Sequence, residues 1–333
     1  ALATAAIVFP VFSVGQALGG RRAGWLAAVI AALNPAVIGF AGLIWDTSLL
    51  ALGVCVTAWW SWRLAARRPG AWGWIAFGLW LGALALLNPA LTIAYPLFVL
   101  YPATRHAGWR LPGLIVPVAA TVLGWGVAIT PWTVRNLVVL DQLMYIRGGL
   151  WLEVWLGACP EASGTGNRVY PTHFPLLNPD QQQRVASLGE AAYIDEARRM
   201  AREAIAADPA RFVRLSAARA LDYRAGTVFT HTTAGEARLP SSRARQVVLI
   251  VLLAEAAVLL LGLVRWRRLP PGTGWLFGVI ALFPLVYYFT HTAVRFRAPI
   301  EPLVGLIVAA VLVGLFRPRG HAAPAPPAPP AAP

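Results

Sequence analysis

Arginines at the ends of apolar segments are the first residues in this chain whose type and spacing could do chemistry. Arg135 and Asn136 end one apolar run just after Trp132, and Arg295 and Arg297 precede the last run. A guanidinium binds phosphate oxygens in bidentate fashion, and an asparagine adds a neutral donor. The alternative for Arg135 is an anchor that reaches to lipid headgroups beside Trp132. The pattern predicts an anion site at a membrane surface.

Aromatic side chains surround a carboxylate just beyond Arg135. Trp151 and Trp155 flank Glu153, and indole rings can stack on the apolar C–H faces of sugars. The alternative is a helix that lies in the membrane interface with its tryptophans at headgroup level. The candidate residues for a pocket that binds a sugar are Asn136, Trp151, Glu153, Trp155 and His291. The candidate phosphate ligands are Arg135, Arg147, Arg295 and Arg297.

Acidic side chains beside or inside apolar runs are further candidates. Asp46 opens a run, where a carboxylate can be a base, a metal ligand or, most commonly, a helix N-cap. Glu255 lies near the middle of another run, and interhelical pairing explains it better than catalysis. Glu301 begins the last run and can pair with a nearby arginine.

The cysteine and histidine patterns argue against a metal centre. Cys55 lies in an apolar run and Cys159 in a polar stretch, so we expect neither a disulfide nor a metal site from them. P-loop, GxSxG and HExxH motifs do not occur in the sequence. The histidines interpreted as ordinary surface residues are His106, His173, His231 and His321.

Composition indicates a polytopic membrane protein. Of the 333 residues, 58% are hydrophobic and 13% are charged, against about 25% charged in soluble domains. All 28 basic residues are arginine, which a GC-rich coding bias explains. Arginines that flank membrane helices account for the net charge of +14. We therefore expect a lipid bilayer, and no nucleic acid, as a partner.

Apolar runs of nearly bilayer-spanning length predict about nine transmembrane helices. The runs are residues 1–18, 23–43, 47–64, 71–87, 90–103, 111–130, 246–264, 272–290 and 298–316. Pro10 and Asn34-Pro35 should break the first two. The predicted domains are six transmembrane helices (1–134), an extracytoplasmic helical segment (135–243), three transmembrane helices (244–318) and a disordered Ala/Pro tail (319–333).

Arginine alternates between successive connections, and this alternation predicts the topology. The short connections around Asp46 and around Asn88-Pro89 carry no arginine. The positive-inside rule places the arginine-bearing connections in the cytoplasm, so the polar stretch faces the periplasm or exterior. Arg295 and Arg297 breach this pattern, which favours a bound anion there. The cytoplasmic arginines are Arg21, Arg22, Arg63, Arg67, Arg68, Arg105, Arg110, Arg265, Arg267, Arg268, Arg317 and Arg319.

The polar stretch contains signals for three helices. Asn178-Pro179 starts a short one. Ser187-Leu188-Gly189-Glu190 has the pattern of a capping box that opens an amphipathic helix through Ala207. Asp208-Pro209 then supplies an N-cap and an N1 proline for a helix through about Tyr223. We expect a small α-helical cap without strands.

Several of these segments together resemble the bacterial GT-C polytopic glycosyltransferases of the family 39 type, which are related to protein mannosyltransferases and the lipid A aminoarabinose transferase. The resemblance covers nearly the whole chain, and it rests on the order and spacing of motifs that are individually weak. The matching segments are Gly19–Gly24 with Asn34-Pro35, Pro131–Asn136, Leu150–Gly157, Asn178-Pro179 with Ala192-Tyr193, Asp208–Phe212 and Arg295–Pro302.

The resemblance implies an all-α GT-C-like fold in the cytoplasmic (inner) membrane and transfer of a hexosyl or pentosyl group from a polyprenyl-phosphate donor. The acceptor would be a glycan, lipid or protein at the outer face, and the reaction leaves room for a divalent cation. The family's catalytic carboxylate lies in the first outer loop. Because the first residue shown is predicted to lie outside, we expect a truncated N-terminus with that loop upstream of residue 1. Asp46 is only a second-place candidate for its role.

Two interpretations from other classes remain open. A transporter or flippase of lipid-linked material would share the arginines, and broken helices at Asn34-Pro35 and Asn88-Pro89 suit a carrier. Against it, the hydropathy shows no pair of matching halves. A truncated, inactive scaffold that only binds lipid is the second alternative.

Overall fold

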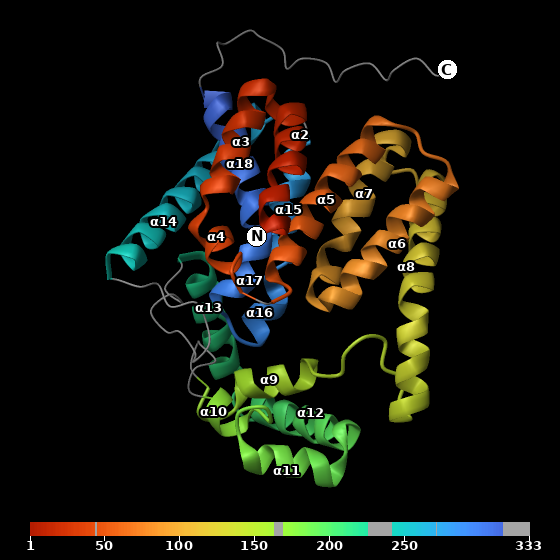
Figure 1. Ribbon diagram of the computed structural model, residues 1–333, viewed down its shortest axis with the longest axis vertical. Coiled ribbons are helices and arrows are strands. Elements are labelled where there is room, and N and C mark those ends of the chain that lie inside the picture. The colour runs from red at the N-terminus through yellow and green to blue at the C-terminus, as the bar shows by residue number, and fades with distance from the viewer. Residues whose placement is uncertain (44, 163–168, 226–241, 271, 316–333) are drawn as a thin grey trace. The chain divides into compact units, whose positions relative to one another are not determined.

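The computed structural model describes residues 1–43, 45–162, 169–225, 242–270 and 272–315 (Figure 1). These residues form helices and no β-strand, which confirms the all-α prediction. Two compact units are present. The first comprises Ala1–Ile129, Ala254–Phe283 and Ala298–Pro333, and the second comprises Thr130–Leu253 and Pro284–Arg297. The predicted tail 319–333 lies outside the described residues, as do His231 and His321.

Four segments are helical, long and apolar enough to cross a membrane, namely Leu2–Gly19, Thr47–Ala66, Leu111–Leu140 and Arg295–Gly314. Shorter apolar helices are Ala71–Leu87, Ile250–Val264 and Gly274–Phe289. Among the described residues the count of spanning candidates is thus smaller than the nine predicted. The predicted runs 23–43 and 90–103 contribute none of the four, because Asn-Pro breaks divide or shorten their helices.

Short helices and turns connect the longer ones of the first unit. Its elements are α1 (Leu2–Ala6), α2 (Val8–Gly19), α3 (Arg21–Leu33), α4 (Pro35–Phe40), α5 (Thr47–Ala66), α6 (Ala71–Leu87), the 3-10 helix η1 (Pro89–Ala94), α7 (Tyr95–Ala107), η4 (Trp266–Arg268), α15 (Gly274–Leu282), η5 (Ala298–Ile300) and α18 (Glu301–Leu315). The first break falls at Ile7. Pro10 lies in the first turn of α2, where its missing N–H costs no helical hydrogen bond.

The first unit has its core around α18, which packs against α2 and α3. Most of its residues are buried. A Cβ built on Gly305 would lie 2.9 Å from Cγ2 of Ile30, and one on Gly15 would lie 3.0 Å from Cα of Gly24. Small residues at such positions let helix backbones approach closely, which is the main source of packing energy between helices in lipid.

Glycines also set the contact between α6 and α8 (Leu111–Leu140). A Cβ on Gly78 would collide with the Thr121 carbonyl oxygen, and one on Gly124 would collide with the Ile75 carbonyl oxygen. The two backbones therefore touch at both positions. Any larger side chain there would force the helices apart.

Both Asn-Pro breaks use the same arrangement. The Asn34 side chain accepts hydrogen bonds from the backbone N–H of Ala36 and Val37 at 2.9 and 3.2 Å. Its Nδ2 donates to Glu301 Oε2 at 3.1 Å. Asn34 and Glu301 are both buried. Each asparagine thus caps the next helix with its oxygen and binds a distant carboxylate with its nitrogen.

The second break repeats this pattern around Asn88. Its side chain accepts a hydrogen bond from the Ala90 N–H at 3.0 Å, and its Nδ2 donates to Asp46 Oδ2 at 3.2 Å. Asp46 stands at the N-cap position of α5, as predicted, but makes no capping hydrogen bond with its side chain. Its carboxylate instead receives the Asn88 amide.

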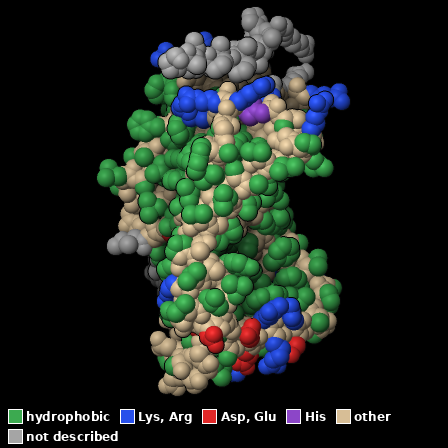
Figure 2. Space-filling model, turned by 90° about the vertical axis from the view of Figure 1, so that its right-hand side faces the viewer, with side chains coloured by type: hydrophobic (Ala, Val, Ile, Leu, Met, Phe, Trp, Pro, Cys, Tyr) green, Lys and Arg blue, Asp and Glu red, His purple; other side chains and the backbone are tan. Residues whose placement is uncertain are grey.

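Many large hydrophobic side chains of the described residues are exposed. Figure 2 shows one face on which hydrophobic side chains predominate and arginines form a band at one end. On α8 the side chains of Leu111, Ile115, Val122 and Val127 are all more than half exposed. An exposed apolar face of this length is typical of contact with lipid. The structure therefore supports membrane association.

The second unit is built from helices that range from the four-residue α10 to the 18-residue α12. They are α9 (Leu150–Ala158), α10 (Tyr170–His173), α11 (Pro179–Leu188), α12 (Glu190–Ala207), α13 (Pro209–Ala225), α16 (Leu285–Phe289) and α17 (Val294–Arg297). One further helix, α14 (Ser242–Val264), runs from the second unit into the first. Leu152 and Leu156 of α9 pack on Tyr193 and Ala197 of α12, which face them with the i, i+4 spacing of one helix face.

Two of the three predicted helix starts are confirmed. Asn178 accepts from the Asp180 N–H at 2.9 Å, and Asp208 accepts from the Arg211 N–H at 2.8 Å. The capping box predicted at Ser187 is wrong. Gly189 is the N-cap of α12, with φ +81°, and Ser187 lies inside α11, where its hydroxyl donates to the Arg184 carbonyl. The positive φ explains the interruption, since glycine adopts it without strain.

Candidate functional site

Three polar side chains from separate parts of the second unit meet beside α9. Tyr170 Oη donates to Glu153 Oε2 at 2.6 Å. His291 Nδ1 lies 3.2 Å from the same carboxylate oxygen. The Tyr170 hydroxyl also lies 3.1 Å from His291 Nε2. Glu153 comes from α9, Tyr170 from α10 and His291 from the connection between α16 and α17. We call these three residues the carboxylate cluster.

Close backbone packing positions the cluster. A Cβ on Gly157 would collide with the carbonyl oxygen of Thr290, the neighbour of His291. Only glycine therefore lets α9 approach this connection closely enough. Arg219 of α13 is fully buried and stabilises the same contact, because its guanidinium donates to the carbonyls of Gly157 and Tyr288. Burial and the charge of Arg211 lower the pKa of Arg219 to about 10.

The cluster favours an ionised carboxylate. Burial opposes the charge of Glu153, but His291, the Tyr170 hydroxyl and the charge of Arg295 outweigh it and lower the pKa of Glu153 below its ordinary value. The Glu153 side chain is 31% exposed and that of His291 is 9% exposed. The Glu153 side chain is thus partly exposed, whereas the imidazole is buried.

This arrangement can perform two kinds of chemistry. An ionised, partly exposed carboxylate accepts hydrogen bonds from hydroxyl groups and stabilises positive charge that develops on a neighbouring molecule. Imidazole is the side chain best suited to exchange a proton near neutral pH. A carboxylate that holds an imidazole in one orientation is a recurring element of proton-transfer sites. The cluster therefore suits polar substrates rich in hydroxyl groups.

The predicted phosphate ligand Arg297 is used inside the protein. Its Nη1 donates to the carbonyls of Tyr223 and Arg224 at 3.1 and 2.8 Å. These carbonyls belong to the last turn of α13. Arg297 is buried, whereas Arg295 is half-buried, with its guanidinium over the Phe296 ring at 4.9 Å. Of the two arginines, Arg295 is the one within reach of solvent.

Arg135 and Asn136 lie at the end of α8, where the following loop folds back. Asn136 is buried, and its Nδ2 donates to the carbonyls of Met144 and Ile146 at 3.0 and 3.2 Å. Trp132 Nε1 also donates to Ile146, at 2.9 Å. The exposed Arg135 lies over the Trp132 ring and donates to Asn136 Oδ1 at 3.0 Å. The predicted pocket residue Asn136 therefore holds the loop, and Arg135 keeps an accessible guanidinium.

The two predicted pocket tryptophans have different surroundings. The guanidinium groups of Arg198 and Arg202 each lie 5.3 Å from the Trp151 ring, which makes this indole a cation–π partner of α12. Trp155 instead packs edge-on against His173 with ring centroids 6.2 Å apart. Arg147 is exposed.

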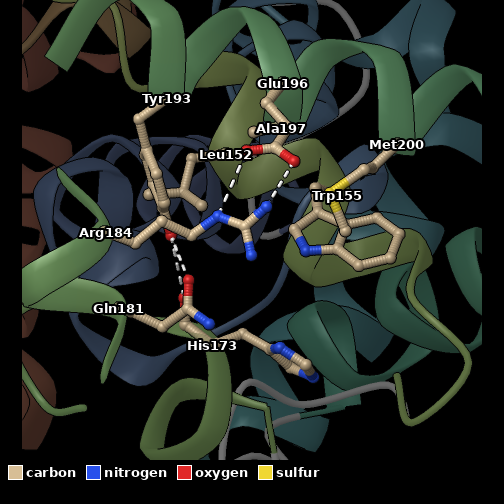
Figure 3. Close-up of a pocket in the computed structure, with 9 residues that line it drawn as sticks. All are labelled: Leu152, Trp155, His173, Gln181, Arg184, Tyr193, Glu196, Ala197 and Met200. Atoms are coloured by element: carbon tan, nitrogen blue, oxygen red, sulfur yellow. Dashed lines mark hydrogen bonds and ion pairs between the residues drawn. The ribbon is translucent and has the colours of Figure 1, made fainter. Parts of the chain in front are cut away.

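A small pocket of about 50 Å³ opens between α9, α11 and α12 (Figure 3). Trp155 and His173 line it, and Figure 3 shows the ion pair of Arg184 with Glu196 across it at 2.5 Å. None of the lining residues belongs to the carboxylate cluster. The cluster is the candidate site because its carboxylate contacts a buried histidine, whereas the arginine of the ion pair in the pocket wall is about half exposed.

Two residues of the site were not predicted from the sequence. Tyr170 gives no periodic signal, because it begins a four-residue helix whose place depends on tertiary packing. Arg219 does leave a signal. Phe212, Ser216, Arg219 and Tyr223 share one face of α13 at helical spacing, and this face is buried or half-buried throughout, so an arginine falls on the inward face.

Comparison with known proteins gives no match. No family model, no curated protein and no solved structure is similar to the chain.

Proposed function

We propose that the protein is a membrane glycosyltransferase that moves a sugar from a polyprenyl-phosphate donor to an acceptor. The observation that carries the proposal is the carboxylate cluster. It joins Glu153, in the segment that resembles one GT-C motif, to His291, which lies just before the Arg295–Pro302 segment that resembles another. Residues from two motifs far apart in sequence thus meet around one partly exposed carboxylate.

The residues of the cluster have distinct roles in this proposal. Glu153 binds hydroxyl groups of the sugar or acceptor and stabilises positive charge that develops at the sugar carbon as the phosphate leaves. His291 exchanges a proton with the acceptor hydroxyl. Arg295 neutralises the departing phosphate. Arg297 and Asn136 are positioning residues, since their contacts run to backbone carbonyls.

Arg135 and Arg147 are the remaining candidates for the donor phosphate, because both guanidinium groups are exposed. The acceptor class is a glycan, lipid or protein. A divalent cation could assist departure of the phosphate. The site of reaction in the proposal is the outer face of the cytoplasmic membrane, with the second unit in the periplasm or exterior, as the alternation of arginines predicts.

Mass spectrometry of envelope glycans and glycolipids tests the proposal. A strain that lacks the gene should lose one glycosylated species, and the wild-type protein should restore it. Glu153→Gln should lower its amount by about 100-fold, since it removes the charge that acts on the transition state. Glu203→Gln is the matched control, because Glu203 is exposed and pairs with Arg199 of the same helix. Arg295→Ala should behave like Glu153→Gln.

The alternatives give different results in the same experiment. A carrier would change where the intact lipid-linked sugar is found, without forming a new glycosidic bond. If Glu153→Gln restored the wild-type amount of product at normal protein level, the proposed role of the cluster would be wrong.

A further inference from the structure

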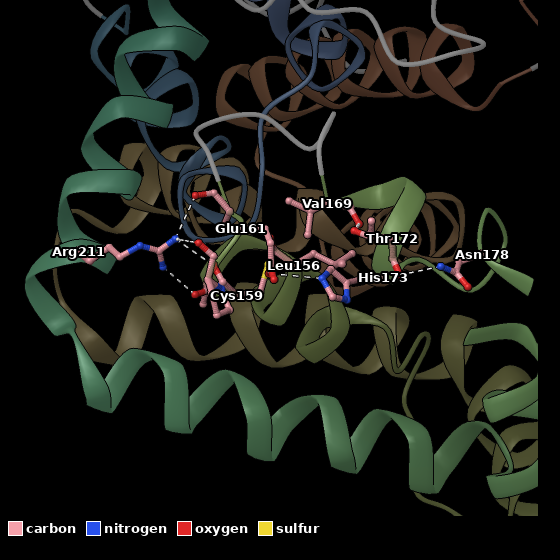
Figure 4. A network of polar contacts seen from close by, with 11 residues as sticks. Leu156, Cys159, Glu161, Val169, Thr172, His173, Asn178 and Arg211 are labelled. Carbon is pink, nitrogen blue, oxygen red and sulfur yellow. Dashed lines mark hydrogen bonds and ion pairs between the residues drawn. The ribbon is translucent and has the colours of Figure 1, made fainter. Parts of the chain in front are cut away.

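A second group of chemically reactive side chains lies in the same unit and takes no part in the proposed reaction. The Sγ of Cys159, a carboxylate oxygen of Glu161 and a ring nitrogen of His173 all lie within 4.8 Å of one another. Cys159 is fully buried, His173 is half-buried and Glu161 is exposed. His173 Nε2 lies 3.4 Å from Glu161 Oε2. Figure 4 shows these three side chains converging between the end of α9 and α10.

The backbone on both sides of this group is held firmly. One guanidinium, that of Arg211, donates to the carbonyls of Ala158, Cys159, Pro160 and Ala162 at 2.9 to 3.1 Å (Figure 4). These carbonyls follow one another around the turn that carries both the thiol and the carboxylate. A guanidinium satisfied in this way fixes the turn in one conformation.

The histidine is fixed from the other side. The backbone N–H of His173 donates to the Val169 carbonyl at 2.9 Å. Asn178 Nδ2 donates to the carbonyl of the preceding residue, Thr172, at 2.9 Å. The Trp155 ring packs edge-on against the imidazole. The three residues that carry the potential ligand atoms thus stand on two backbone segments that hydrogen bonds hold in place. The site is therefore preorganised.

The donor set itself selects the kind of ion. A thiolate, an imidazole and a carboxylate are the ligands that Zn²⁺ accepts in tetrahedral sites, whereas Mg²⁺ and Ca²⁺ prefer sites made of oxygen alone. Three protein ligands leave a fourth position for water. The exposed Glu161 and the pocket that His173 lines give an ion and a water molecule access from solvent.

The geometry points to a Zn²⁺-binding site formed by Cys159, Glu161 and His173, with a water molecule as fourth ligand. The site joins the end of α9 to α10, and these helices carry Glu153 and Tyr170 of the carboxylate cluster. Bound Zn²⁺ therefore stabilises the scaffold of that cluster. From the sequence we expected no metal at Cys159, because the two cysteines lie in different kinds of segment, and we interpreted His173 as an ordinary surface residue.

Cobalt substitution of the purified full-length chain in detergent micelles tests the site. Co²⁺ should bind in a one-to-one ratio and give a thiolate-to-cobalt charge-transfer band with the visible bands of tetrahedral cobalt, and Zn²⁺ should displace it. Cys159→Ala should abolish the charge-transfer band, whereas Cys55→Ala, which removes the other cysteine, should leave it intact. His173→Ala and Glu161→Gln should weaken binding. Arg211→Gln should weaken it by about 10- to 100-fold, as expected for support around a metal site.

Two further measurements keep the inference testable if the Cys159 variant fails to fold. X-ray absorption of the zinc-loaded wild-type chain should show one sulfur neighbour at about 2.3 Å. Zn²⁺ should also raise the thermal unfolding temperature of the wild type, and Mg²⁺ should not. A first shell without sulfur, or a charge-transfer band that Cys55→Ala removes and Cys159→Ala retains, would overturn the inference. Both readouts are independent of sugar transfer, so they succeed or fail separately from the proposed function.

Discussion

At the scale of single residues, Glu153 has the strongest contacts in the candidate site. Its carboxylate receives the Tyr170 hydroxyl and lies beside His291, while the charge of Arg295 acts on it from farther away. The lowered pKa means that these partners bind the ionised form better than the neutral form. Protonation of this one group should therefore loosen the connection between α9 and the segment that carries His291.

This linkage predicts how stability depends on pH. The pKa of Glu153 is lower in the folded protein than its ordinary value of 4.5. Between the two values the unfolded chain binds more protons, so stability rises with pH there. The contribution of Glu153 is complete above pH 4.5 and is lost as the pH falls through the folded value. Thermal unfolding from neutral pH to about pH 3 should show a smaller acid loss for Glu153→Gln than for the wild type. Equal slopes for the two proteins would rule out this linkage.

Part of the site was predictable at this scale. Glu153, His291 and Arg295 stood out in the sequence because charged or aromatic residues gather at the ends of apolar runs. Tyr170 and Arg219 could not be selected in the same way. Arg219 contacts residues more than sixty positions away in the chain. Tyr170 begins a helix that is too short to give a periodic signal. Arg297 stood out in the sequence as a charge beside an apolar run, and in the structure its guanidinium donates to carbonyls in the last turn of α13.

At the scale of helices, α9 depends on one glycine. Gly157 touches the Thr290 carbonyl oxygen, whereas Gly149, at the N-cap of the same helix, has open space around it and φ of −67°. Overpacking at a close contact costs about 1–3 kcal/mol. Gly157→Ala should therefore lower the unfolding temperature and reduce sugar transfer, and Gly149→Ala should change neither by much. Circular dichroism in detergent measures the unfolding temperature. A larger decrease in this temperature for Gly149→Ala than for Gly157→Ala would contradict the packing argument.

Helix ends show what local sequence can and cannot predict. Asn178-Pro179 and Asp208-Pro209 were predicted correctly, because an N-cap followed by proline acts through neighbouring backbone atoms alone. The capping box at Ser187 failed, because Gly189 offers a left-handed conformation two residues later and α11 continues through the serine. Residue types alone cannot predict which of two neighbouring positions starts a helix when both positions provide hydrogen bonds for the backbone.

At the scale of the whole molecule, composition was enough to predict an all-α membrane protein. The number of spans was harder to predict, because apolar runs broken by Asn-Pro have the composition of a spanning helix without its length.

The predicted topology rests on the arginines, and fusions test it. Alkaline phosphatase joined after Asp208 should be active, since this enzyme folds only outside the cytoplasm. Fusions after Arg67 and Arg105 should be inactive. An active fusion after Arg67 together with an inactive fusion after Asp208 would show that the predicted orientation is inverted.

The hydrogen bond between Asn34 and Glu301 has a consequence for synthesis. The two residues are 267 positions apart, so the Asn34 amide enters the bilayer long before Glu301 leaves the ribosome. An unsatisfied buried amide costs about 1–3 kcal/mol. The nascent protein should therefore stay incompletely assembled until α18 inserts. In a pulse-chase experiment, a chain that stops at Arg297 should be degraded faster than one that stops at Leu315. Equal half-lives would show that the early helices assemble without waiting for the last one.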